Sequence, residues 1–290
     1  MKNHENVPCN ICGTNAFEKR YYSIRSGFLV KCERCDLYYA NPRHTEYIQS
    51  VVSETTPTER YEAKKLNPEG RKKEFNFILD EIEKIKQPPG KILDIGCYEG
   101  FFLSEARVRG WDCHGVEPNR GGAAFARDTL HLNIKQCVLE NANYVNNCFD
   151  VITVLATLEH LPDPLGTLNA IKRILKTNGC LIITVPTIPF YLPLIKSKWR
   201  MFIGDHYFFF NDISISKLLN RAGFHLMIPG KYIAKTFDLE TMSSRLTDEW
   251  QPNNLGMLGY AIRAIVQSLR IGKLSITMNP YDSKLYIARM

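Results

Sequence analysis

Short apolar segments alternate with amphipathic segments through the middle of the chain. From 91 to 185 the apolar runs have the length of strands, and the segments between them carry apolar residues at helical spacing. The predicted elements are, in chain order, a strand at 91–97, a helix at 101–109, a strand at 112–117, a helix at 123–130, a strand at 151–156, a helix at 164–175 and a strand at 180–185. This alternation predicts an α/β fold, in which a parallel sheet carries helices on both faces.

Three further segments flank this region. Apolar residues from Phe75 to Ile85 recur at helical spacing and predict a leading helix that ends before Gly90. Residues 255–271 repeat the helical pattern, and we expect this helix to pack against the core, with a dimer face or a membrane-surface helix as the alternatives. Residues 283–290 alternate between apolar and polar positions and predict a closing strand.

Composition and charge narrow the class of protein. The chain has 290 residues, of which 44% are hydrophobic and 23% charged, so it has the composition of a globular protein. Its apolar runs are shorter than the roughly 20 residues that a membrane-spanning helix needs, and its first residues are polar. The formal net charge of +7 favours acidic partners, which include phosphorylated substrates, nucleic acid and anionic membranes, without choosing among them.

Four of the nine cysteines form two C-x-x-C pairs near the start of the chain. Cys9 and Cys12 form the first pair, and Cys32 with Cys35 the second. Two such pairs predict a closed tetrahedral zinc site of the structural kind, which would stabilise a module too small to fold on its core alone. Four unmetallated thiols or a redox pair remain the alternative. Because no secretory signal is visible, we expect a reducing, cytoplasmic environment.

A glycine-containing loop follows the first predicted strand, where parallel sheets bind ligands. It runs from Asp94 through Gly96 to Gly100, and the glycines allow a sharp turn and a close approach of the backbone to a ligand. The dinucleotide fingerprint fails here because Tyr98 stands where it requires glycine, which disfavours a nicotinamide oxidoreductase. Glu117 ends the next strand and can accept hydrogen bonds from both hydroxyls of a ribose.

The third motif begins in the strand at 151–156 and continues into Glu159, His160 and the segment Pro162-Asp163-Pro164, where Asp163 is the expected helix N-cap. With these three motifs the sequence resembles the class I S-adenosylmethionine-dependent methyltransferases. It is similar to the branch whose first motif reads L-D-I-G-C-G-x-G and whose fourth strand runs into L-E-H-L-P-D-P. The resemblance covers residues 75–290.

This resemblance implies a Rossmann-like methyltransferase fold with a mostly parallel, seven-stranded sheet. The cysteine module is similar to the zinc-binding domain that precedes some members, among them sugar C-methyltransferases. The implied organisation is a zinc ribbon at 1–50, a linker and leading helix at 51–88, and a methyltransferase domain at 89–290, with a cap at 188–210 and a late helical insertion at 235–280.

The resemblance also implies which residues bind S-adenosylmethionine. Those expected around its methionine part are Asp94, Gly96, Tyr98 and Gly100. Those expected around its ribose, adenine and sulfonium methyl are, in that order, Glu117 with Pro118, Val138 with Leu139, and Ala156 with Thr157. Two positions depart from the family pattern: Tyr98 replaces a glycine, and Val138 stands where many relatives have an acid.

Methyl transfer from a sulfonium needs alignment of the reactants and, for a hydroxyl acceptor, removal of a proton. His206 is the first candidate for the base because it precedes an aromatic run in the cap and histidine titrates near neutral pH. His160 and Glu159 are the next candidates. Some quinone-type relatives hold a divalent metal with an additional acid where this chain has Ala156, so metal-assisted methylation is disfavoured.

By analogy with the family, we expect O-methylation of a sugar or polysaccharide precursor, carried on a nucleotide or a lipid. An RNA base methyltransferase is one alternative, although the Asn-Pro-Pro-Tyr type of motif is absent and nucleic acid is therefore disfavoured. A non-catalytic binding protein with a vestigial methyltransferase fold is the other. Peripheral membrane contact and any oligomeric state stay open.

Overall fold

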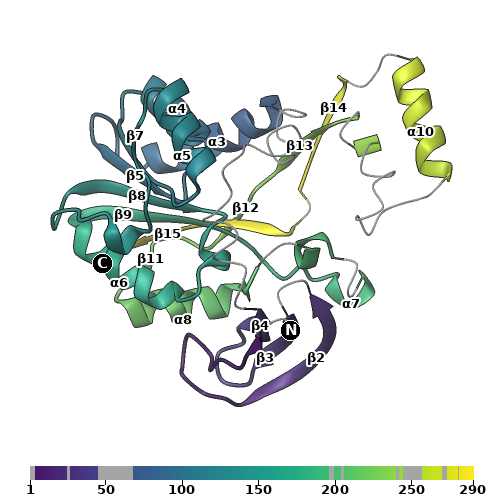
Figure 1. Cartoon of the computed structure of the whole chain (residues 1–290), viewed down its shortest axis with the longest axis horizontal. Helices are drawn as coiled ribbons and strands as arrows, with labels where there is room; N and C mark the ends of the chain where they lie inside the picture. Colours follow the sequence, from purple (N-terminus) through teal and green to yellow (C-terminus); the bar gives the residue numbers. More distant parts are fainter. Residues whose placement is uncertain are drawn as a thin grey trace.

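A computed structural model describes residues 4–24, 27–44, 68–195, 199–203, 206–239, 242–243, 257–269, 273–279 and 281–290. Figure 1 shows a small sheet at the N-terminus, in purple, below a larger α/β domain in blue, teal and green. A segment at the right of the view, ending in helix α10, extends away from both.

The large sheet has strand order β11-β15-β9-β8-β5-β6-β7, and β12 also pairs with β15. Its parallel strands are β5 (Lys91–Ile95), β6 (Asp112–Val116), β7 (Asn133–Lys135), β8 (Phe149–Leu155) and β9 (Leu175–Pro186). Its antiparallel strands are β15 (Ser283–Arg289), β11 (His225–Leu226) and β12 (Lys231–Tyr232). The seven strands on the main path match the expected fold, and the closing strand lies where alternation predicted it.

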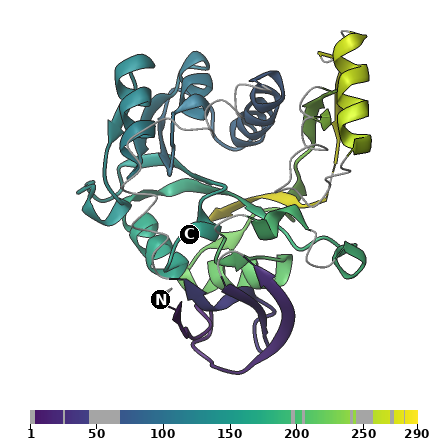
Figure 2. The same ribbon diagram turned by 45° about the vertical axis from the view of Figure 1, so that its right-hand side comes forward.

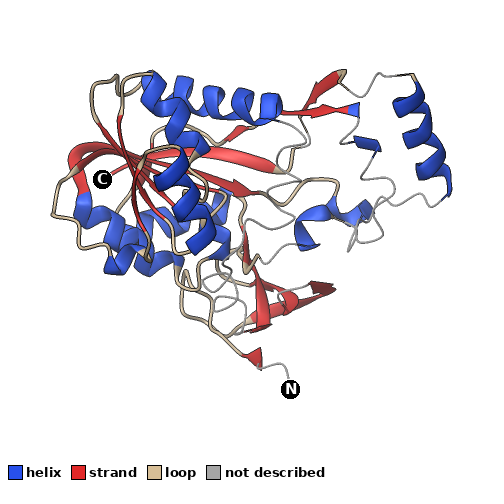
Figure 3. Cartoon of the chain, turned by 45° about the horizontal axis from the view of Figure 1, so that its top comes forward, coloured by secondary structure: helices blue, strands red, loops and turns tan. Residues whose placement is uncertain are grey.

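Helices cover both faces of this sheet, as Figure 3 shows. Val151 and Ile152 illustrate the cause, because successive side chains of a strand point to opposite faces and these two belong to different apolar clusters. The helices that share a cluster with Val151 are α3 (Pro68–Glu83), α4 (Phe101–Val108) and α5 (Arg120–Ala124). Those that share one with Ile152 are α6 (Pro164–Ile174) and α8 (Asp212–Ala222).

One helix differs from its predicted bounds. The segment predicted as a helix at 123–130 begins at Arg120 as α5 and continues as the π-helix η1 (Phe125–Thr129). The side chain of Asn119 accepts the N–H of Gly122 at 2.8 Å and fixes the early start. The two glycines that follow Arg120 have low helix propensity, which is why the pattern placed the start too late. Asp163 caps α6 as predicted, accepting from Gly166 at 3.0 Å.

The N-terminal module is an antiparallel sheet of order β1-β4-β3-β2. Its strands are β1 (His4–Glu5), β2 (Phe17–Ile24), β3 (Gly27–Cys32) and β4 (Tyr38–His44). A strand from the cap, β10 (Phe208–Phe209), pairs antiparallel with β4, with Phe208 opposite Tyr39. The sheet of the module therefore continues into the α/β domain.

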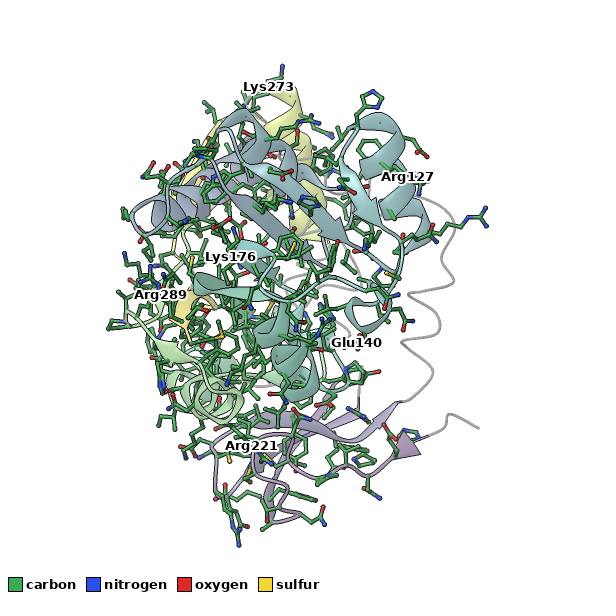
Figure 4. The ribbon with its side chains drawn as sticks, turned by 90° about the vertical axis from the view of Figure 1, so that its left-hand side faces the viewer. Arg127, Glu140, Lys176, Arg221, Lys273 and Arg289 are labelled. Atoms are coloured by element: carbon green, nitrogen blue, oxygen red, sulfur yellow. The ribbon has the colours of Figure 1, made fainter. Side chains whose placement is uncertain are left out.

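Polar contacts secure the module to the loop that follows β8. Asn10 donates to the Asp163 carboxylate at 3.0 Å and accepts from the Leu165 N–H at 3.1 Å. Arg43 donates to the Pro162 carbonyl at 3.0 Å. Lys217 and Arg221 of α8 also donate to carbonyls of the module, at Arg34 and Ile11. Figure 4 labels Arg221 between the two parts.

The late insertion has a different form from the one expected. It contains a two-stranded ribbon, β13 (Lys235–Asp238) with β14 (Ser275–Met278), and between them α10 (Met257–Ser268). The expectation that this helix packs against the core is wrong. Among its described side chains only Val266 is buried, because α10 lies beyond the end of the ribbon, away from both sheets (Figure 1). In the described part of the chain no helix has the length and apolar character to cross a membrane.

Candidate functional site

The loop after β5 has the backbone conformation that its glycines predict. Gly96 and Gly100 both have φ of +74°, a left-handed conformation that favours glycine. A β-carbon at Gly96 would lie 2.6 Å from the side chain of Thr157, so the loop and the end of β8 approach each other too closely for any side chain there. The glycine loop and the residues after β8 therefore meet directly at the carboxyl edge of the sheet.

Tyr98 takes the place of the expected glycine in this loop and adopts φ of 48°. Its ring lies against α5, where a β-carbon at Gly122 would come within 2.9 Å of the ring. Gly122 therefore gives the tyrosine its space. Sequence reasoning missed Gly122, although the Gly-Gly pair after Glu117 was a visible signal.

Glu117 joins the two loops at this edge. One carboxylate oxygen accepts the N–H of Tyr98 at 2.7 Å, and the other accepts the N–H of Asn119 at 2.7 Å. The side chain is 5% exposed. The carboxylate thus fixes the loop after β5 relative to the loop after β6, at the position where a ribose was expected.

Asp94 lies below the loop and is fully buried. The Thr153 hydroxyl donates to it at 2.7 Å. Burial raises the pKa of Asp94 to about 7; the hydrogen bond from Thr153 lowers it, and the charge of Glu117 raises it further. Asp94 therefore gains and loses a proton near neutral pH.

The other residues expected around the cofactor follow neighbouring strands. Pro118 follows β6, and Val138 and Leu139 follow β7, with Leu139 buried and Val138 39% exposed at the start of the short helix η2 (Leu139–Asn141). Ala156 and Thr157 follow β8, and Ala156 adopts φ of 47°. Since β5 to β8 are parallel neighbours, their carboxyl ends bring all of these positions to one edge of the sheet.

The three candidate bases come together although they lie far apart in the sequence. Glu159 and His160 belong to the short helix η3 (Leu158–His160) directly after β8, and His206 belongs to the cap. A carboxylate oxygen of Glu159 and ring nitrogens of both histidines all lie within 4.8 Å of one another. The two imidazole rings have centroids 4.6 Å apart. We call this group the acid–base cluster.

Burial controls the charge of Glu159. The residue is 1% exposed, and neither carboxylate oxygen accepts a hydrogen bond from another residue in the described part of the chain. Burial raises the pKa of Glu159 to about 8, against the opposing effects of its own backbone N–H and the charge of Lys235. At neutral pH this side chain is mostly protonated, so it can donate a proton to a neighbouring imidazole.

A single residue of the cap connects this cluster to the module. The N–H of Tyr207 donates to the Glu159 carbonyl at 2.8 Å, and its carbonyl accepts the N–H of Ala40 at 2.8 Å. The guanidinium of Arg43 lies over the Tyr207 ring at 5.2 Å. Strand β4 of the module thereby holds the segment that carries His206.

The aromatic residues of the cap form its own core instead of lining a substrate surface. Trp199 and Phe202 pack edge to face with centroids 4.9 Å apart, and both contact Phe209. All three are buried. Phe190 is 79% exposed, and Lys196 and Lys198 of the same segment lie outside the described residues.

The four cysteines of the module converge as their spacing predicts. Their sulfur atoms lie within 4.8 Å of one another, and those of Cys12 and Cys32 are 3.7 Å apart. A tetrahedral zinc with bonds of about 2.3 Å places neighbouring sulfurs about 3.8 Å apart. The donor set and spacing therefore fit a zinc ion.

Residues 69–227, more than half of the chain, match the family model described as a methyltransferase domain. The chain belongs to this methyltransferase family. The match begins after the module and ends before the late insertion.

Single proteins resemble this chain either over a short segment or at low sequence identity. A segment is 34% identical over 97 residues to the ubiquinone biosynthesis O-methyltransferase of Pseudomonas aeruginosa (strain UCBPP-PA14), and it spans 31% of this chain and 41% of that protein. Among solved structures, the YcgJ protein from Bacillus subtilis has a TM-score of 0.53 at 13% identity, covering 76% of this chain and 99% of that one. Phosphoethanolamine N-methyltransferase 2 of Haemonchus contortus, in complex with S-adenosyl-L-methionine, has a TM-score of 0.52 at 14% identity, covering 87% and 61%. These structures confirm the expected fold.

The contact between Tyr98 and Gly122 predicts an unusual response to substitution. Gly→Ala inside a helix normally stabilises by up to about 1 kcal/mol, but in Gly122→Ala the added methyl overlaps the Tyr98 ring. We expect the free energy of unfolding in urea to fall, by about 1–3 kcal/mol. Tyr98→Gly should restore much of it in the double variant, and additive effects in the double-mutant cycle would show that the two residues are not coupled.

The raised pKa of Glu159 predicts a pH-dependent stability. Its ordinary value is 4.5 and its folded value about 8, so the folded state binds more protons between these values and its stability falls as pH rises through them. Glu159→Gln lacks this loss. Between pH 5 and pH 9 the free energy of unfolding in urea should therefore rise for the variant relative to the wild type. The expected rise is up to a few kcal/mol, at about 1.4 kcal/mol per pKa unit. The exposed Glu140→Gln is the control; the same gain there would contradict the assignment.

Proposed function

We propose that this protein transfers a methyl group from S-adenosylmethionine to a hydroxyl oxygen of a small molecule, and that the acceptor is a sugar or glycan precursor. The observation that carries the proposal is the acid–base cluster. Glu159, His160 and His206 meet directly after Thr157, which contacts the glycine loop. A proton acceptor next to the cofactor edge is what methylation of a hydroxyl requires.

The residues at this edge fit the cofactor. Gly96 keeps the backbone open, the Glu117 carboxylate stands at the ribose position, and Leu139 offers an apolar surface to adenine. When bound, the cofactor supplies an electrophilic methyl group with a good leaving group. The chain's own contribution is then to hold the acceptor in line and to remove its proton.

In the proposed mechanism His206 accepts the proton of the acceptor hydroxyl. His160 lies within reach of it and can share that proton. Glu159 can take over the proton only in its ionised form, because burial raises the pKa of this carboxyl to about 8 and keeps it mostly protonated near neutral pH. A carboxylate with two imidazoles is also a donor set for divalent metals, so assays should be run with and without a chelator.

The family resemblance of the sequence supports a sugar acceptor. The similarity to the ubiquinone biosynthesis O-methyltransferase of Pseudomonas aeruginosa supports a phenolic acceptor instead. The two acceptors differ in acidity. A phenolic hydroxyl ionises near pH 10, whereas a sugar hydroxyl is a much weaker acid and depends more strongly on a base. A panel that contains both nucleotide-linked sugars and catechols therefore separates them.

The cofactor site is tested by thermal unfolding with S-adenosylhomocysteine, with NAD as the control ligand. At 100 times its dissociation constant a ligand stabilises by about 2.7 kcal/mol, so the midpoint should rise with S-adenosylhomocysteine and not with NAD. Glu117→Ala should weaken this shift. If neither ligand acts at saturating concentration, the chain is a binding protein with a vestigial fold and the proposal fails.

The base is tested with the acceptor that the panel identifies, using S-adenosylmethionine with a labelled methyl group. We expect His206→Asn to lower kcat by about 100-fold or more while S-adenosylhomocysteine still binds. The dependence of kcat on pH should lose its acidic limb in this variant. An unchanged kcat would remove His206 from the reaction, and methyl incorporation into RNA instead of either small-molecule class would overturn the acceptor.

We also propose that Cys9, Cys12, Cys32 and Cys35 bind one structural zinc ion. The sulfur spacing supports this, and so does the size of the module, which buries too little apolar surface to fold without a further constraint. The metal would join the turn of Cys9 and Cys12, which precedes β2, to the turn of Cys32 and Cys35, which lies between β3 and β4. Strand β4 carries Ala40, which holds Tyr207.

Elemental analysis of the purified protein should give one zinc per chain. Cys32→Ser should lose it and reduce the hydrogen-exchange protection of the Tyr207 N–H, whereas Cys148→Ser, outside the module, should keep both. S-adenosylhomocysteine should still bind to Cys32→Ser, because the cofactor edge is built from β5 to β8. A metal-free protein with a fully protected Tyr207 N–H would refute the zinc proposal.

A further inference from the structure

The described part of the late insertion exposes several large apolar side chains. We call β13, α10 and β14 together the arm. On α10, Leu258 and Ile265 are 60% and 56% exposed, and Leu269, directly after the last residue of the helix, is 62% exposed. They recur with Ile262 at intervals of three and four residues, so they form one stripe along the helix. A stripe of this kind normally faces a partner.

Other elements extend this apolar surface. Leu274 and Ile276 at β14 are 60% and 44% exposed, and in the cap Phe190 and Leu194 are 79% and 85% exposed. The rings of Phe190 and Tyr281 lie 6.1 Å apart, which links the cap to the base of the arm. Figures 1 and 2 show the cap helix α7 (Leu192–Ile195) and α10 toward the same side of the molecule.

Charge distinguishes among the partners that this surface can take. From 257 to 279 the sequence contains three cations, Arg263, Arg270 and Lys273, and no aspartate or glutamate. Figure 4 shows Lys273 at the outer edge of the molecule. A second copy of the chain, joined through this surface by a two-fold axis, would bring like charges together. An anionic lipid surface would instead neutralise them.

The dimensions of α10 agree with a helix that lies along a membrane surface. It has 12 residues, so it is about 18 Å long, well short of the roughly 30 Å of a bilayer core. A short helix with an apolar stripe and a basic residue as its only charge, Arg263 in α10, is compatible with a helix that lies in the plane of the lipid interface.

We propose that the arm docks this protein on an anionic lipid membrane. The stripe of Leu258, Ile262, Ile265 and Leu269 enters the boundary between headgroups and acyl chains, and Lys273 contacts the lipid phosphates. This interaction goes beyond the proposed methyl transfer and does not depend on it, because the arm lies outside the matched methyltransferase segment.

The test is flotation of the full-length protein with two kinds of vesicle, phosphatidylcholine alone and phosphatidylcholine mixed with phosphatidylglycerol. We expect binding to the mixed vesicles only, and release by high salt. Ile265→Glu and Leu269→Glu should each weaken the binding at least about tenfold. Val108→Glu is the matched control, since Val108 is 82% exposed on α4, away from the arm, and should leave binding unchanged.

Two further measurements keep the outcome decisive. S-adenosylhomocysteine should stabilise the arm variants as it does the wild type, which separates loss of docking from loss of folding. Light scattering should give the same molecular mass for wild type and Ile265→Glu. An oligomer that Ile265→Glu dissociates would assign the surface to a second copy and overturn the proposal. Equal flotation of wild type and Ile265→Glu, or no flotation with either vesicle, would overturn it as well.

Discussion

The backbone of Tyr207 is the contact on which the rest of the site depends. Its N–H binds the carbonyl of Glu159 at the end of the large sheet, and its carbonyl binds the N–H of Ala40 in the module. Neither hydrogen bond involves a side chain, so sequence changes at these positions preserve them unless proline is introduced. Because His206 precedes Tyr207 directly, the same two bonds place an imidazole from the cap beside Glu159 and His160. The module is therefore part of the geometry of the acid–base cluster.

At the cofactor edge, the residue at position 98 depends on the residue at position 122, although the two lie in different elements. Tyr98 in the loop after β5 and Gly122 in α5 occupy one space, and Glu117 accepts hydrogen bonds from both loops. A tyrosine in place of the family's glycine is tolerated because the compensating absence of a side chain is found 24 positions later. Asn119 completes the arrangement, since its side chain caps the helix on which Gly122 lies. The departure of Tyr98 from the family motif is therefore explained by the helix that packs on it, α5.

Much of the fold was predictable from sequence because parallel strands buried on both faces are continuous apolar runs, which is why β5, β6 and β8 lie within a few residues of their expected bounds. The convergence of the four cysteines followed from their spacing, whereas the positions expected around the cofactor came from the resemblance to the methyltransferases. The approach of His206 to Glu159 depends on how β10 pairs with β4, and two-residue strands carry no pattern of their own. The exposure of α10 could not be predicted either, because an apolar stripe looks the same whether a core or a membrane covers it.

The pairing of β10 with β4 has a consequence for how this protein could have evolved. By sequence the module ends before the leading helix, yet its sheet includes Phe208 and Phe209 from a distant part of the chain. Four consecutive aromatic residues, Tyr207 to Phe210, are buried in the apolar cluster that the two parts share. A shortened chain that began at α3 would expose them on an open strand edge, which invites aggregation. The module cannot be lost or exchanged by a simple fusion event, and inheritance would be expected to keep it and the cap together as one unit.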